Sequence, residues 1–157
     1  MTLLSRKVDY ALLILSYLSR QPEGGCAREI AAQFELSRGF VANILKLLCH
    51  KGFVVSHRGV KGGYVLQRPA ADIRLADLMD ALDGSFHLTE CNKVPVEDKC
   101  SLVHVCPLKN AVGEVYQRIR EVLRNVTLAE LFKAPERAGD TQFGLSLATP
   151  GEKHLIA

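Results

Sequence analysis

The sequence predicts a mainly α-helical protein: a winged helix-turn-helix with a small β-hairpin wing and a long C-terminal dimerisation helix. Three observations support this fold class. Helical patterns separated by very short turns fill the first 50 residues, a basic and glycine-rich hairpin pattern follows, and a long amphipathic pattern begins near residue 107. Two helices joined by a short turn and followed by a hairpin are typical of winged helices.

The first two helices are predicted from the spacing of apolar residues. In residues 5–20 these side chains recur at intervals of three and four, and Ser5 is a suitable N-cap. Gln21–Gly25 contains one proline and two glycines, which predicts a turn. Residues 27–34 then form a shorter helix with one apolar face.

The third helix and the wing follow directly. Ser37 is placed to cap a helix that runs to about His50, and Gly52 ends it. Two β-prone runs, 53–55 and 64–66, flank eight residues that are basic and rich in glycine. This pattern predicts a β-hairpin with a cationic tip.

Three further segments complete the pattern. Residues 75–83 form a helix, Pro107 is well placed at the first position of a long helix that runs to about Asn125, and Thr127 caps a short helix over 128–132. The long helix carries an apolar seam of Leu108, Val112, Val115, Tyr116, Ile119, Val122 and Leu123. Such a seam favours packing against a second copy, although the helix could also pack on its own domain.

The charge distribution divides the chain. Residues 1–68 hold ten Lys/Arg and four Asp/Glu, giving +6, whereas residues 69–157 hold ten Lys/Arg and thirteen Asp/Glu, giving −3. A basic N-terminal half indicates an anionic partner, most simply nucleic acid. We predict a DNA-binding domain over 1–68, a cluster-binding loop with dimerisation helices over 69–133, and a disordered tail over 134–157.

Several protein classes are disfavoured by the sequence. No apolar run approaches the roughly 20 residues that a membrane-spanning helix needs, so we expect a cytoplasmic protein without a membrane partner. No phosphate-binding loop or paired nucleophile and base is present, so we do not expect an enzyme. Five cysteines, an odd number, do not read as a disulfide framework.

The predicted recognition helix begins with residues suited to base edges. Arg38 is suited to guanine or phosphate, Asn43 to an adenine edge and Phe40 to a thymine methyl group. Arg58 in the wing is suited to the narrow minor groove. For each residue the alternative is an ordinary solvated surface position. The full predicted DNA-contact set is Ser37, Arg38, Phe40, Asn43, Arg58 and Lys61.

Cys91, Cys100 and Cys106 lie together between two helical segments, spaced C-x8-C-x5-C. Structural zinc sites usually contain closely paired cysteines, which this loop lacks. Three widely spaced thiolates instead suit a bulkier iron–sulfur cluster, which normally requires a fourth ligand. The candidates for that ligand are Asp9, His104, His87 and Glu90.

These motifs resemble the Rrf2-type bacterial regulators. The resemblance covers about residues 1–133 and is carried by the opening LSRKVDYA, the wing RG…GGY, the three cysteines and the later NVTL. It implies a homodimer with a long crossing helix that binds near-palindromic double-stranded DNA. It also implies a cluster held by Cys91, Cys100 and Cys106, with 4Fe–4S favoured and 2Fe–2S as the alternative.

The resemblance is incomplete at the fourth ligand. The iron–sulfur cluster biogenesis regulator has a histidine three residues after its last cysteine, where this chain has Lys109. The nitric-oxide-sensing repressor uses an aspartate of the partner's first helix, and Asp9 stands at that position. The resemblance therefore favours Asp9 in trans. The long spacing between the first two cysteines is closer to the spacing in the rhizobial iron regulator. The resemblance therefore does not fix which signal the protein senses.

The sequence as a whole predicts a transcriptional regulator, in the simplest case a repressor, whose operator binding is controlled by an iron–sulfur cluster that senses iron, nitric oxide or redox state. Two alternatives remain. The cysteines could form a cluster-free thiol switch, or the winged helix could dock a protein partner instead of DNA.

Overall fold

The computed structural model describes residues 4–58, 62–84, 86–89, 100–102 and 104–133. The chain begins with α1 (Arg6–Ser19), α2 (Ala27–Gln33) and α3 (Arg38–His50). Both predicted serine caps are confirmed: Ser5 accepts a hydrogen bond from the Val8 N–H (3.3 Å) and Ser37 from the Phe40 N–H (3.2 Å). A short polar side chain thus fixes where each helix begins.

The turn between α2 and α3 is tight. Glu35 adopts φ 54°, a left-handed conformation that non-glycine residues rarely occupy. The next residue, Leu36, donates its N–H to the Ala31 carbonyl at 2.9 Å, which closes the end of α2. Gly52, at φ 75°, follows α3 as predicted, because glycine tolerates this geometry without a Cβ clash.

The wing is a two-stranded antiparallel hairpin of β1 (Val54–His57) and β2 (Gly63–Leu66), with Val54 opposite Leu66. Strand β2 is also bonded to the turn before α2, near the loop end of the hairpin. Gly25 donates to the Tyr64 carbonyl at 3.0 Å and accepts from the Tyr64 N–H at 2.9 Å. The predicted hairpin is therefore confirmed, and the backbone of Gly25 is hydrogen-bonded to its second strand.

The second half contains a 3-10 turn η1 (Ala70–Asp72) and the helices α4 (Leu75–Asp83), α5 (Lys109–Asn125) and α6 (Leu128–Phe132). The predicted start of the long helix at Pro107 was wrong, because α5 begins two residues later. Turns precede it: the Leu102 carbonyl accepts from Cys106, and the Cys106 carbonyl accepts from Lys109. The Thr127 cap of α6 is confirmed.

One hydrophobic core joins both halves of the chain. Leu15 and Leu45 from the first half, and Ile73, Leu78 and Leu128 from the second, are fully buried in it. A backbone bond from Leu128 to the Ile73 carbonyl (2.9 Å) ties α6 beside η1. Residues on both sides of the predicted domain boundary near residue 68 therefore pack into the same core. The predicted tail over 134–157 lies outside the described residues.

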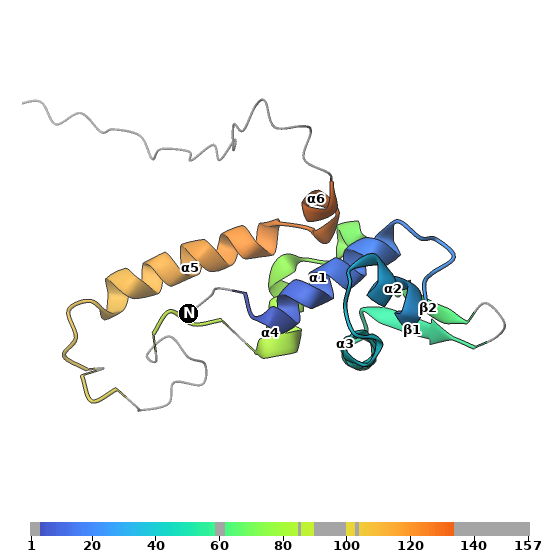
Figure 1. The fold of residues 1–157 in the computed structure, drawn as a ribbon. Helices are drawn as coiled ribbons and strands as arrows, with labels where there is room; N and C mark the ends of the chain where they lie inside the picture. Colours follow the sequence, from blue (N-terminus) through green and yellow to red (C-terminus); the bar gives the residue numbers. More distant parts are fainter. Residues whose placement is uncertain (1–3, 59–61, 85, 90–99, 103, 134–157) are drawn as a thin grey trace, which may run out of the picture.

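Helix α5 extends away from this core, as Figure 1 shows. Of its 17 residues only Tyr116 is buried. Arg120 fastens α5 to α4 through two hydrogen bonds to the Asp80 carboxylate, at 2.7 and 3.3 Å. Within the described part of the chain, no helix is long and apolar enough to cross a membrane.

Candidate DNA-binding surface and cysteine loop

The N-terminal two turns of α3 present the predicted base-contact residues to solvent. Ser37, Arg38, Phe40 and Asn43 are all exposed, whereas Val41 on the opposite side of the helix is fully buried. The Ser37 hydroxyl oxygen also caps α3, so its position is fixed by the helix start. This amphipathic arrangement leaves one side of α3 free for an external partner.

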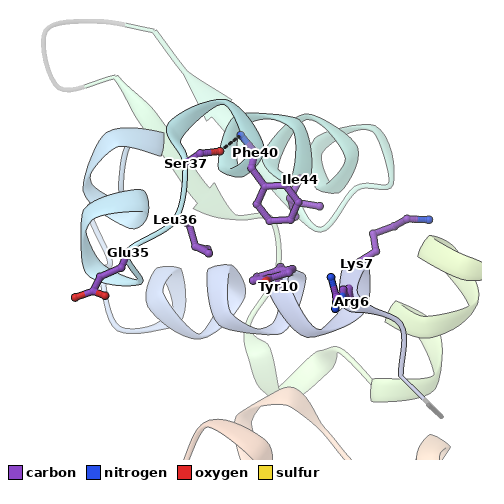
Figure 2. A pocket seen from close by; sticks show the side chains of 8 residues that line it. All are labelled: Arg6, Lys7, Tyr10, Glu35, Leu36, Ser37, Phe40 and Ile44. Carbon is purple, nitrogen blue, oxygen red and sulfur yellow. Dashed lines mark hydrogen bonds between the residues drawn. The ribbon is translucent and has the colours of Figure 1, made fainter. Parts of the chain in front are cut away.

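Phe40 is anchored rather than freely mobile on the surface. Its ring packs edge-to-face on Tyr10 of α1, with the ring centroids 4.7 Å apart and an interplanar angle of 80° (Figure 2). About a third of Phe40 (36%) remains exposed. Such aromatic pairs contribute roughly 0.5–1.5 kcal/mol beyond the buried area. No local sequence pattern links residue 10 to residue 40, so this contact could not be predicted from the sequence.

The wing carries Arg58 directly after β1, exposed to solvent, whereas Lys61 lies outside the described residues. The glycine at the start of β2 has a structural role that the sequence did not indicate. A Cβ atom on Gly63 would lie 2.9 Å from the Gly25 carbonyl oxygen, closer than side chains normally approach. Gly63 is therefore required for close packing of β2 against the Gly25 backbone.

Two of the three clustered cysteines can be described. Cys100 and Cys106 are free thiols and are half-buried, in the turns that lead into α5. The Cys106 N–H donates to the Leu102 carbonyl at 2.8 Å. Cys91 lies outside the described residues, so its relation to the other two stays a prediction.

The candidates for a fourth ligand differ in their surroundings. Asp9 is exposed in the first turn of α1 and His104 is exposed in the loop, whereas Glu90 lies outside the described residues. His87 is half-buried, and its Nδ1 atom is buried without a hydrogen-bond partner in the described part. A buried unpaired nitrogen costs free energy, so this atom calls for a partner. Across that same part, no three Cys, His, Asp or Glu residues gather as a metal site.

The apolar seam of α5 divides into two faces. Tyr116 is buried and stacks near Phe86, with the ring centroids 5.9 Å apart, and Leu123 is half-buried against the core. Val115 and Val122 point to solvent and are 49% and 51% exposed. The helix thus uses one side of its seam for its own domain and leaves the other uncovered in the single chain.

Comparison with known proteins places these features among transcriptional regulators. The model of the Rrf2 family, described as iron-dependent transcriptional regulators, matches residues 4–134. Protein aau3 of Rhizobium meliloti (strain 1021) is 35% identical over 138 residues, which cover 83% of this chain and 85% of that protein.

Two solved structures are similar over most of their length. The global cysteine regulator CymR (YrzC) of B. subtilis has a TM-score of 0.66 and 25% identity, covering 84% of this chain and 97% of its own. IscR of T. potens has a TM-score of 0.64 and 28% identity, covering 88% and 92%.

Proposed function

The chain belongs to the Rrf2 family of transcriptional regulators, which are not enzymes, and on this basis we propose that it binds operator DNA as a homodimer. The exposed surface of the N-terminal two turns of α3 carries this proposal. Its residues Arg38, Phe40 and Asn43 are free to meet base edges, while the buried side of α3 fixes the helix in the core. Arg58 would contact the DNA backbone or the minor groove next to the site that α3 occupies. We expect the protein in the cytoplasm.

The uncovered face of α5 supports the dimer. Val115 and Val122 lie on one side of a helix that extends beyond the core, so two copies could bury these residues against each other. A dimer would hold two α3 helices at a fixed separation, which must match two half-sites about one DNA turn apart.

We further propose that an iron–sulfur cluster held by Cys91, Cys100 and Cys106 controls this geometry. The described residues fit such a group: two free, half-buried thiols precede the start of α5, and soft thiolates are the usual cluster ligands. The family description as iron-dependent points the same way. When bound, the cluster would supply a centre that reacts with oxidants or nitric oxide, with 4Fe–4S favoured over 2Fe–2S.

Asp9 of the partner subunit is the proposed fourth ligand, and His87 is the alternative. Asp9 is exposed and free to reach a second chain, whereas the unpaired Nδ1 of His87 would act within one chain. Either ligand would tie the loop that precedes α5 to another element. The cluster would then favour one dimer geometry over another, which is the requirement for control of DNA affinity.

A cluster-free thiol switch is the second candidate. The similar CymR structure belongs to a protein described as a cysteine regulator, and Cys100 and Cys106 are both free and within one loop. Oxidation of these thiols to a disulfide would also constrain the start of α5.

The test is anaerobic purification followed by native mass spectrometry and visible spectroscopy of the wild type, Asp9→Ala and His87→Ala. We expect a brown wild type whose mass includes a cluster, and a loss of cluster stability in one of the two variants. Colourless protein with stoichiometric zinc would contradict the cluster. Colourless metal-free protein whose DNA affinity changes with thiol oxidation would favour the switch.

DNA binding is tested separately. Duplexes selected from a random pool should be bound with an affinity that falls steeply as salt rises, because Lys and Arg displace counterions from phosphates. Binding that does not depend on salt, or no selection of DNA at all, would favour a winged helix that docks a protein partner.

A further inference from the structure

A cavity of about 530 Å³ lies between α1 and the recognition helix α3 (Figure 2). Its apolar walls include Tyr10, Leu36, Phe40 and Ile44. Arg6 and Lys7 lie at one end, and Glu35 lies at the opposite end (Figure 2). The cavity therefore combines a nonpolar surface with two cationic residues at the end away from Glu35, beside the proposed base-contact residues. This combination fits an anion that has an apolar part attached.

The two adjacent cations differ in their partners. The Lys7 ammonium donates to the Leu82 carbonyl at 3.1 Å and pairs with the Asp83 carboxylate at 3.2 Å. Arg6 is exposed, and its guanidinium makes no hydrogen bond or ion pair with any residue of the described ranges. The charge of Lys7 is thus already matched by α4, whereas the charge of Arg6 is available to a ligand.

We propose that Arg6 binds a phosphodiester of the operator when α3 enters the major groove, so that α1 forms a second DNA contact beside the recognition helix. This inference rests on the proposed DNA-binding function. A guanidinium holds phosphate oxygens through two parallel hydrogen bonds, and Arg6 forms no ion pair with a carboxylate of the described residues. The phosphate supplies the anion, and the deoxyribose supplies the apolar part that faces Tyr10 and Phe40.

The Tyr10–Phe40 contact gives Arg6 a fixed relation to the bases. Arg6 lies one turn before Tyr10 on α1, and Tyr10 packs against the ring of Phe40 on α3 at 4.7 Å. A phosphate held by Arg6 would therefore set how deeply and at which position α3 lies in the groove. Phosphate contacts of this kind position a protein without reading sequence.

The experiment measures DNA affinity against salt for the full-length wild type, Arg6→Ala, Arg6→Lys and Lys7→Met, all on one duplex selected with the wild type. Each subunit contributes one Arg6, so the slope of log affinity against log salt should fall by about 1.8 in the Arg6→Ala homodimer, equal to about a 12-fold change over a fourfold salt range. Arg6→Lys should restore the slope. Lys7→Met is the matched control and should keep the wild-type slope, because its charge is paired with Asp83.

The outcomes separate this inference from the proposed function. If the wild type showed no salt-dependent DNA binding, both the proposed DNA-binding function and the Arg6 contact would be contradicted. A wild type that binds DNA while Arg6→Ala keeps its full slope would overturn the Arg6 contact alone. Equal slope losses in Arg6→Ala and Lys7→Met would also overturn it, because the effect would then reflect the general charge of this helix.

A free anion is the other source of the same chemistry. Inorganic phosphate, added at constant ionic strength, should weaken DNA binding of the wild type and of Arg6→Ala equally. A larger effect on the wild type would show that the cavity holds small anions, and would overturn the assignment to the DNA backbone. Thermal unfolding of Arg6→Ala should match the wild type, because Arg6 has no partner in the described structure.

Discussion

Helices α3 and α5 have similar amphipathic patterns, yet they are buried to very different extents. The 13 residues of α3 include four that are buried, Val41, Ile44, Leu45 and Leu48. The 17 residues of α5 include one, Tyr116, and two valines of its seam are about half exposed. The apolar side of α3 is therefore buried within one chain, whereas that of α5 stays partly exposed in the single chain.

The same contrast separates the two proposed functional regions. The DNA-facing residues of α3 rest on a complete core and on the Tyr10–Phe40 contact. The cysteine loop precedes α5 and contains exposed apolar residues, with Leu102 at 59% and Val105 at 74%. We infer that the first region is formed in the single chain and that the second is completed by a cluster, a partner subunit or both.

The largest expected effect is a loss of stability when a core side chain of α3 is shortened. Leu45→Ala should lower the free energy of unfolding by about 2–5 kcal/mol, because it removes a fully buried side chain and leaves a cavity. Val122→Ala, measured by urea unfolding at low protein concentration, should change stability by less than about 0.5 kcal/mol. Equal losses of stability in the two variants would contradict the difference in burial between α3 and α5.

A charge on the exposed face of α5 should weaken association. Val115→Asp places a carboxylate where the dimer would bury an apolar side chain, so we expect a rise of about thirtyfold in the dissociation constant, equal to about 2 kcal/mol. Analytical ultracentrifugation measures the dissociation constant of the dimer. Gln117→Asp, an exposed position on the same helix with the same charge change, is the control. An unchanged dissociation constant in Val115→Asp would mean that Val115 does not lie in the dimer interface.

The link between α4 and α5 should have a smaller effect. Arg120 and Asp80 are 16% and 32% exposed in their side chains, and they are joined by two hydrogen bonds. A double-mutant cycle with Arg120→Met and Asp80→Asn should give a coupling energy of about 1–2 kcal/mol in thermal or urea unfolding. A coupling energy near zero would mean that α5 is held to the core by its apolar contacts alone.

The smallest expected effect lies at the cap of α6, where the Glu130 side chain is exposed to solvent. Hydrogen bonds from the Thr127 N–H and hydroxyl lower the pKa of the Glu130 carboxyl below its ordinary value of 4.5. Because the folded pKa is depressed, this stabilisation is present above the ordinary pKa and is lost as the pH falls through the folded value.

Unfolding of Glu130→Gln across this pH range measures the effect. The variant should be less stable than the wild type at neutral pH, and the difference should shrink in acid. A difference that does not change with pH would indicate that the carboxylate charge plays no part in the cap.

Much of the fold follows from local patterns. The starts of α1, α3 and α6 were predicted from Ser5, Ser37 and Thr127, because capping acts over three residues of the same segment. The wing was predicted from its glycines and β-prone flanks. The start of α5 was misplaced, because Pro107 favours a helix start but the turns that include Leu102 and Cys106 delay it.

The sequence by itself determined the order of the elements, the family resemblance and the exposed residues of the recognition helix, since periodicity and caps depend on near neighbours. Only the tertiary structure decided that the Tyr10 ring packs against Phe40, that the Gly25 backbone lies against Gly63, and that Lys7 is ion-paired while Arg6 has no such partner among the described residues. These contacts join residues far apart in the chain, and their geometry depends on how whole helices pack. Local sequence patterns carry no information about such distances.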